Sequence, residues 1–281
     1  MIRAIFFDLD GTLFDRAAAH RLYCLDLMAR YPNVFLPLHH ASDLLRLERD
    51  DDAGWDRRRF ARGVVSRFPG VGLTASELAA DHASRLPGFV RPDPSVTLLF
   101  AALNDRYRLA IVSNGSSQCQ RAKLARLDLG HPPPRAFLSG ELGVAKPEPA
   151  LFQKALDWVD CTPREALFVG DDPVRDIAGA AALGMATCWV SAGRAYPPGL
   201  PAADLTIDRV ADLSRWTWSF WILNDVQTLG ATGCTQPVSQ NLAIAHGLST
   251  TRGTQQPLDR DGHPSGKSKN ADTNGLAGAL K

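Results

Sequence analysis

The stretch Ala4-Ile-Phe-Phe-Asp-Leu-Asp-Gly-Thr12 lies near the start of the 281-residue chain and decides the fold that the rest must fit. Its apolar part, which ends at Phe7, is short and bounded by glycine, as is typical of a buried strand in a parallel sheet. Asp8 and Asp10 follow directly, and two carboxylates at this spacing repel each other unless a cation neutralises them. Because open α/β sheets bind ligands at the carboxyl ends of their strands, the pair is a candidate metal or catalytic site. The simpler alternative is that both aspartates only cap the following helix.

Composition limits the class of protein. Hydrophobic residues make up 45% of the chain and charged residues 22%, which is ordinary for a globular protein. A net charge of +1 argues against broad binding to a nucleic acid polymer or to a membrane surface. The five cysteines form no Cys-x-x-Cys pair and suit reduced thiols better than a disulfide framework. With no signal-peptide pattern and no run long enough to span a membrane, we expect a cytoplasmic protein, monomer or homodimer.

Hydrophobic patterns divide the chain into three parts. Residues 1–14 and 93–216 alternate between strands and helices, which predicts a parallel sheet with helices on both faces. Residues 15–92 carry helical patterns only and are expected to form an all-helical insertion. Residues 217–281 are rich in Gly, Ser, Thr, Asn and Gln, and we expect a disordered tail there.

The predicted helical insertion contains clear helix boundaries. Asp15 is a candidate N-cap, and Thr74 begins a capping-box pattern, whereas Pro32 and Pro37 are expected to bracket a loop. The basic run Arg57-Arg-Arg59 could reach an anionic part of a substrate, but a charged, solvated helix face is the favoured interpretation.

Polar motifs recur where predicted strands end. Their carboxylates, hydroxyl, ammonium group and glycine-turn N–H groups could converge at one end of the sheet, a combination that suits a phosphate and a magnesium ion. The four motifs are Asp8-x-Asp10-Gly-Thr12, Ser113-Asn114-Gly115, Lys146-Pro147 and Gly170-Asp171-Asp172 with Asp176 beyond it.

With these four motifs in this order, the chain resembles the haloacid dehalogenase superfamily over residues 1–213. The resemblance implies an α/β fold with a Rossmann-like parallel sheet in the order 5-4-1-2-3. The insertion after the first motif is similar to the all-helical cap of one branch of that superfamily. Residues 15–92 would then be the cap domain, and residues 1–14 and 93–216 the core domain.

The resemblance also implies roles for individual residues. Asp8 would attack phosphorus as the nucleophile, and Asp10 would protonate the leaving oxygen and then activate water. Asp172 is a candidate outer-shell residue or a helix N-cap, and Asp176 could lie near the metal or on an exposed helix surface. The metal, Mg²⁺, would be held by Asp8, Asp10 through its backbone carbonyl, and Asp171. The phosphate would be bound by Thr12, Ser113, Asn114, Gly115 and Lys146.

The reaction is narrowed further by Asp10, because the haloalkanoate dehalogenases of the superfamily typically lack this second aspartate. A Mg²⁺-dependent phosphatase acting on a small phosphate monoester is therefore favoured. A phosphomutase of the same fold and a catalytically silent binding or interaction protein stay open. The motifs also resemble the branch that contains pyrimidine 5′-nucleotidases and N-acylneuraminate-9-phosphatases, which implies a sugar phosphate or a nucleoside monophosphate as the substrate.

Overall fold

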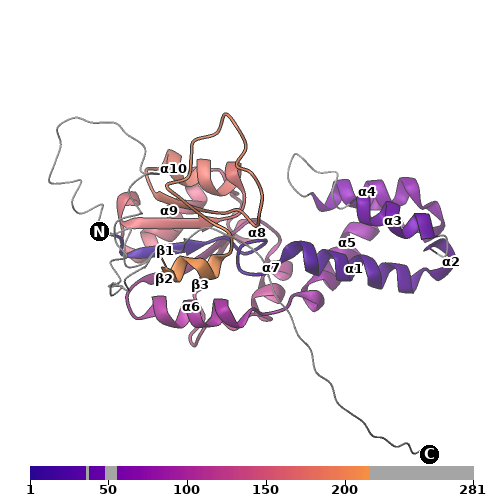
Figure 1. Cartoon of the computed structure of the whole chain (residues 1–281), viewed down its shortest axis with the longest axis horizontal. Helices are drawn as coiled ribbons and strands as arrows, with labels where there is room; N and C mark the ends of the chain where they lie inside the picture. The colour runs from indigo at the N-terminus through magenta and orange to yellow at the C-terminus, as the bar shows by residue number, and fades with distance from the viewer. Residues whose placement is uncertain (36–37, 48–55, 216–281) are drawn as a thin grey trace, which may run out of the picture. The chain divides into compact units, whose positions relative to one another are not determined.

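The computed structural model describes residues 1–35, 38–47 and 56–215 (Figure 1). Its centre is a six-stranded sheet in the order β3-β2-β1-β4-β5-β6, and every neighbouring pair is parallel. Read from the other edge, this is the expected order 5-4-1-2-3 with one more strand beside β5. The strands are β1 (Ala4–Phe7), β2 (Arg108–Ser113), β3 (Arg135–Leu138), β4 (Ala166–Gly170), β5 (Ala186–Val190) and β6 (Leu205–Ile207).

Strand β1 lies in the middle of the sheet, and its four residues are all buried. Alternate side chains of a strand point to opposite faces, and here they enter two separate apolar clusters. Phe7 packs against Phe100 of α6, with ring centroids 4.9 Å apart, whereas Phe6 joins the cluster that contains Phe152 of α9. The expected helices on both faces of the sheet are therefore confirmed.

The helices that follow the strands are short. A π-helical turn, Pro173–Ala178, leads directly into α10. Short 3₁₀ turns occur at Pro69–Val71, Leu86–Phe89, Pro163–Glu165 and Val210–Arg215. The helices of this part are α6 (Pro94–Asn104), α7 (Ser117–Leu124), α8 (Ser139–Leu142), α9 (Pro149–Val159) and α10 (Gly179–Ala182).

Between β1 and α6, the described residues contain helices and turns but no strand, as expected. Asp15 accepts a hydrogen bond from the Ala18 N–H (2.8 Å), and Thr74 forms a capping box with Glu77. Helix α4 packs along α5, and α1 contacts α2 and α3. The division into core and cap domains stays a prediction. These helices are α1 (Arg16–Arg30), α2 (Pro32–Phe35), α3 (Leu38–Arg46), α4 (Arg57–Arg67) and α5 (Ala75–Arg85).

One expectation for this segment is wrong. The loop predicted between Pro32 and Pro37 begins with a helical turn, α2. Proline is compatible with the first position of a helix, because the N–H that it lacks would have no partner there. The predicted tail, residues 217–281, lies outside the described residues. Within the described ranges, no helix is both long and apolar enough to cross a membrane.

Candidate functional site

A cavity of about 440 Å³ lies where β1, β2 and β4 end. The parallel register brings the carboxyl ends of these three strands together, so residues far apart in sequence share one wall. Four sequence motifs contribute to its lining, together with residues of α1, α4 and α7. The predicted site residues that line it are Asp8, Asp10, Ser113, Asn114, Gly115, Lys146, Asp171, Asp172 and Asp176.

Lys146 is the cation that lies between two of the acidic residues of the cavity. Its Nζ lies 2.5 Å from Asp8 Oδ1 and 2.7 Å from Asp176 Oδ1, and its side chain is almost completely buried. Burial alone would lower the pKa of Lys146, but the negative charges of Asp176 and Asp8 outweigh it and raise the pKa above its ordinary value. Lys146 is therefore a fixed positive charge beside the Asp8 carboxylate.

Three buried carboxylates could hold a metal ion. Oxygens of Asp8, Asp171 and Asp176 all lie within 4.8 Å of one another. Burial raises the pKa of Asp171 to about 6 and that of Asp176 to about 8, and the negative charge of Asp8 adds to both shifts. A divalent cation would offset the cost of burying these neighbouring negative charges, and carboxylate oxygens are the ligands that Mg²⁺ prefers. The donor set therefore fits the ion that the sequence motifs imply.

The backbone around the acidic cluster leaves little room. Gly11 has φ +84°, and a Cβ built there would lie 2.6 Å from Asp171 Oδ2. The backbone carbonyl of Asp171 accepts hydrogen bonds from Trp189 Nε1 (3.0 Å) and from the Arg194 guanidinium (2.9 Å). That guanidinium also lies 3.2 Å from Asp171 Oδ2, whereas Arg16 is 3.8 Å away. The position of Asp171 is thus set from several sides.

Asp10 lies in a separate hydrogen-bond network. Lys123 Nζ is 2.5 Å from its Oδ1, and Gln120 Nε2 donates to its Oδ2 at 2.7 Å. Burial raises the pKa of Asp10, but the charge of Lys123 and the hydrogen bonds from Lys123 and Gln120 outweigh it, so the pKa lies below its ordinary value. Each of the two carboxyl oxygens of Asp10 therefore has a fixed donor.

The second motif has mixed roles. Asn114 binds the backbone of Lys146 twice, through its side-chain oxygen (2.8 Å) and nitrogen (2.9 Å). The Gly115 N–H donates to Ser139 Oγ at 2.9 Å, so a bound phosphate would have to compete for it. Thr12 Oγ1 is buried and has no hydrogen-bond partner among the described residues, and Thr12, unlike the other predicted phosphate-binding residues, does not line the cavity.

Two of the remaining aspartates differ in their surroundings. Asp172 caps the π-helical turn, because its Oδ1 accepts hydrogen bonds from the N–H groups of Val174 (2.9 Å) and Arg175 (2.8 Å). Asp176 is 1% exposed and faces Lys146 rather than an exposed helix surface. Asp172 is therefore a helix cap that also lines the cavity, and Asp176 is a buried residue of the cavity wall.

Comparison with known protein families identifies the family of this chain. The sequence model of the haloacid dehalogenase-like hydrolase family matches residues 2–184. The chain belongs to this family. Both the fold and the family resemblance predicted from the sequence are confirmed for this haloacid dehalogenase-like hydrolase.

Several relatives carry the names of phosphatases. A phosphoserine phosphatase of Thermus thermophilus is 34% identical over 161 residues, which span 57% of this chain and 64% of that protein, less than two thirds of its length. A glyceraldehyde 3-phosphate phosphatase of Methanothermobacter thermautotrophicus is 30% identical over 197 residues, which span 68% of this chain and 86% of the relative. A solved HAD phosphatase from Thermococcus onnurineus shares the fold, with a TM-score of 0.54 and 23% identity, over 77% of this chain and 98% of its own.

The branch suggested by the sequence motifs is also among the relatives. The pyrimidine 5′-nucleotidase YjjG of Escherichia coli is 32% identical over 125 residues, which span 44% of this chain and 56% of that protein. The fold by itself does not select a reaction, because the L-2-haloacid dehalogenase of Xanthobacter autotrophicus shares it with a TM-score of 0.56 at 20% identity, over 78% of this chain and 99% of its own.

Sequence reasoning missed two residues of this hydrolase's cavity, Gln120 and Lys123. Both lie on α7, and a glutamine and a lysine three positions apart are usually solvent-facing helix residues. The available signal was their place on the helix that directly follows Ser113.

The expectation for Arg57 also needs correction. Arg58 and Arg59 are exposed, but Arg57 is half-buried, lines the cavity and donates to His82 Nδ1 at 3.2 Å. Consecutive helical residues point in directions about 100° apart, so one arginine of the three can face inward while its neighbours face solvent.

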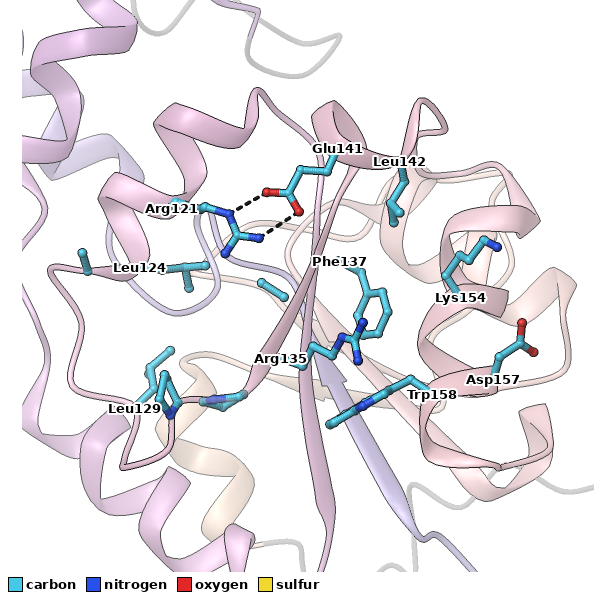
Figure 2. Close-up of a pocket in the computed structure, with 14 residues that line it drawn as sticks. Arg121, Leu124, Leu129, Arg135, Phe137, Glu141, Leu142, Lys154, Asp157 and Trp158 are labelled. Atoms are coloured by element: carbon cyan, nitrogen blue, oxygen red, sulfur yellow. Dashed lines mark hydrogen bonds and ion pairs between the residues drawn. The ribbon is translucent and has the colours of Figure 1, made fainter.

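A second, larger pocket of about 740 Å³ lies beside β3, between α7, α8 and α9 (Figure 2). Figure 2 shows Arg121 of α7 paired with Glu141, and the distance from Arg121 Nε to Glu141 Oε1 is 2.6 Å. Arg135 stacks against Phe137 and Trp158, 5.5 and 5.7 Å from their ring centroids. None of the predicted site residues lines this pocket. The larger of the two pockets is therefore not the one that contains the candidate catalytic residues.

Proposed function

We propose that this protein is a Mg²⁺-dependent phosphatase that hydrolyses a small phosphorylated metabolite through an aspartyl-phosphate intermediate. The observation that carries the proposal is the pairing of a buried nucleophile candidate, Asp8, with a fixed cation, Lys146, beside two further buried acids. The phosphatase names of the relatives support a phosphate monoester as the substrate class. The presence of Asp10 further favours phosphoryl transfer over dehalogenation.

In this mechanism the Asp8 carboxylate attacks phosphorus as the bond to the leaving-group oxygen breaks. Asp10 enters this step in its protonated form, gives the proton to that oxygen and becomes a carboxylate, and Lys146 offsets negative charge on the nucleophile and on the phosphoryl group. Ser113 donates a hydrogen bond to a phosphoryl oxygen. Asp10 then takes a proton from the water that hydrolyses the aspartyl-phosphate, which returns both aspartates to their starting states.

The metal would be held by Asp8, Asp171 and the Asp10 backbone carbonyl, and Asp176 would contact it directly or through water. When bound, Mg²⁺ would supply positive charge to the phosphoryl oxygens. The inclusion of Asp176 rests on its burial and on its place in the acidic cluster.

The test is release of phosphate from p-nitrophenyl phosphate by the purified protein. We expect activity that requires Mg²⁺, stops with a chelator and is lost in Asp8→Asn. Asp105→Asn is the matched control, because Asp105 is an exposed aspartate at the end of α6. Activity that survives in Asp8→Asn, or that needs no divalent ion, would contradict the proposal.

A further inference from the structure

Helix α7 buries two polar side chains against the cavity. Gln120 is 1% exposed and Lys123 is 3% exposed, although residues of both types are mostly found at the surface. Burial of an ammonium group is costly unless it has a partner, and Lys123 donates hydrogen bonds to Asp10 and Gln120. These two polar side chains are therefore buried at the site, where a helix would ordinarily expose them to solvent.

A single network joins these two side chains to Asp10. Lys123 Nζ donates to Gln120 Oε1 at 2.7 Å, which fixes the orientation of the amide. The amide nitrogen of Gln120 then points to Asp10 Oδ2 (2.7 Å), Ser113 Oγ (2.8 Å) and the Asn114 carbonyl (3.0 Å). One amide therefore connects the proposed proton donor to the proposed phosphate-binding hydroxyl.

Anchoring of α7 does not account for this network, because other contacts hold the helix. On its other side Arg121 makes two hydrogen bonds to Glu141 (2.6 and 2.9 Å), and Ser117 makes a third (2.5 Å). Gln120 and Lys123 instead line the cavity together with Asp10. Their contacts restrain a carboxylate that must meet a leaving-group oxygen in one geometry.

We propose that Gln120 and Lys123 are positioning residues that hold the Asp10 carboxyl group for proton transfer to and from the reacting oxygens. The inference rests on the proposed function. Each Asp10 oxygen has two lone pairs, so a fixed donor on each leaves one for the transferred proton. When Asp10 gives its proton to the leaving oxygen, Lys123 stabilises the carboxylate left behind. When the attacking water gives up a proton, Asp10 regains it and the cycle is balanced.

Leaving groups of different basicity separate this role from a merely structural one. A strongly basic leaving group, as in phenyl phosphate, needs a proton as its bond to phosphorus breaks. The p-nitrophenolate anion leaves without one. The ratio kcat/KM reports steps up to formation of the phosphorylated enzyme, so later hydrolysis does not affect it. A loss confined to basic leaving groups therefore reports on the proton that Asp10 supplies.

The experiment measures kcat/KM for aryl phosphates of nearly constant size, from p-nitrophenyl to p-methoxyphenyl, with Lys123→Met and Gln120→Met. A general acid contributes about 10²–10⁴-fold, and we expect each variant to lose at least about tenfold more activity on phenyl phosphate than on p-nitrophenyl phosphate. Lys123→Arg should restore part of that difference. Asp10→Asn, which removes the proton donor itself, should give the largest difference between the two substrates.

Arg121→Met is the matched control, because it removes a cation from the same helix on the side facing Glu141. This variant should lower kcat/KM by the same factor for every substrate, or leave it unchanged. Equal losses across the series in Lys123→Met and Gln120→Met would overturn the inference, as would loss of the folded state in both by circular dichroism. If the wild-type protein hydrolyses none of the esters with Mg²⁺ present, the proposed function fails instead, and this inference fails with it.

Discussion

Two of the groups of polar side chains that are buried in the described part of the chain differ in charge. At the strand ends, Lys146 lies between Asp8 and Asp176 as part of an ion cluster. In the helical segment, His20 and His82 lie 3.0 Å apart, ring nitrogen to ring nitrogen, at 2% and 0% exposure. Burial lowers the pKa of His20 to about 4, and it lowers that of His82 as well. Lys146 in the first group keeps its positive charge, whereas burial keeps the second group neutral.

Hydrogen bonds determine the proton positions in the histidine pair. Arg57 Nε lies 3.2 Å from His82 Nδ1, and because a guanidinium only donates, that nitrogen must accept. A neutral His82 then carries its proton on Nε2 and donates it to His20 Nδ1. His20 in turn carries its proton on Nε2, which lies 3.6 Å from Cys24 Sγ.

The contrast indicates what each group is for. Buried ion pairs contribute little to stability compared with apolar packing, so a cluster of them is better explained by a task that needs charge. A neutral chain of hydrogen bonds satisfies buried polar atoms without separated charge and is consistent with a folding role. Three substitutions test this difference, and the first should have the largest effect.

Lys146→Met removes the cation of the ion cluster and leaves Asp8 and Asp176 without it. We expect phosphatase kcat to fall by about 10²–10³-fold, because a preorganised charge at the reacting centre is lost. Breaking a buried pair should also lower the free energy of unfolding by about 3–5 kcal/mol. Steady-state kinetics and urea unfolding measure the two effects.

The control for this variant is Lys154→Met, which removes an exposed lysine of α9. It should change neither quantity appreciably. If Lys146→Met kept wild-type kcat, the ion cluster would be a structural feature like the histidine pair, and the contrast between the two groups would disappear.

The sequence was sufficient to predict the ion cluster but not the histidine pair. Asp8 and Asp171 each follow a strand within a recognisable motif, and parallel strands bring such residues together at one edge. Lys146 was predicted to follow a strand but lies beyond helix α8, so its Lys-Pro motif was the signal that identified it. His20 and His82 are 62 positions apart on different helices, and a lone histidine on a helix gives no indication of its partner. Lys123 was missed for the same reason, because helical spacing does not show which face is buried.

The second substitution, His20→Gln, tests the neutrality of the histidine pair through pH. The pKa of His20 is about 4 in the folded chain, against 6.5 for an unperturbed histidine. The stability that a neutral His20 contributes is therefore fully present above pH 6.5, the pKa of the unfolded chain. It is lost as the pH falls from there toward about 4, the pKa of the folded chain. Linkage predicts a loss of about 2 kcal/mol from His20 between about pH 7 and pH 5, measured by urea unfolding.

His20→Gln keeps a donor and an acceptor but does not titrate, so its stability should fall less steeply over the same range. His131→Ala removes an exposed histidine and should follow the wild-type slope. The other charged groups that act on the pair are Arg16, Arg57 and Lys123, and both variants keep them. Parallel slopes for wild type and His20→Gln would mean that His20 is not buried as a neutral ring.

The third substitution, Gly11→Ala, should have the smallest effect and compares the two regions directly. Gly11 and Gly72 both have positive φ, +84° and +69°, so alanine costs about 1–2 kcal/mol of unfolding free energy at either position. Only at Gly11 would the new Cβ meet a carboxylate, 2.6 Å from Asp171 Oδ2, whereas nothing lies within 4 Å at Gly72.

Backbone strain is therefore common to the two variants, and displacement of Asp171 is specific to one. We expect Gly11→Ala to raise the Mg²⁺ concentration needed for half-maximal activity by about tenfold, the lower end of the cost of disturbing the surroundings of a metal ligand. Gly72→Ala should leave that concentration unchanged while losing similar stability. An equal Mg²⁺ requirement in both variants would show that the close approach of Gly11 to Asp171 does not position a metal ligand.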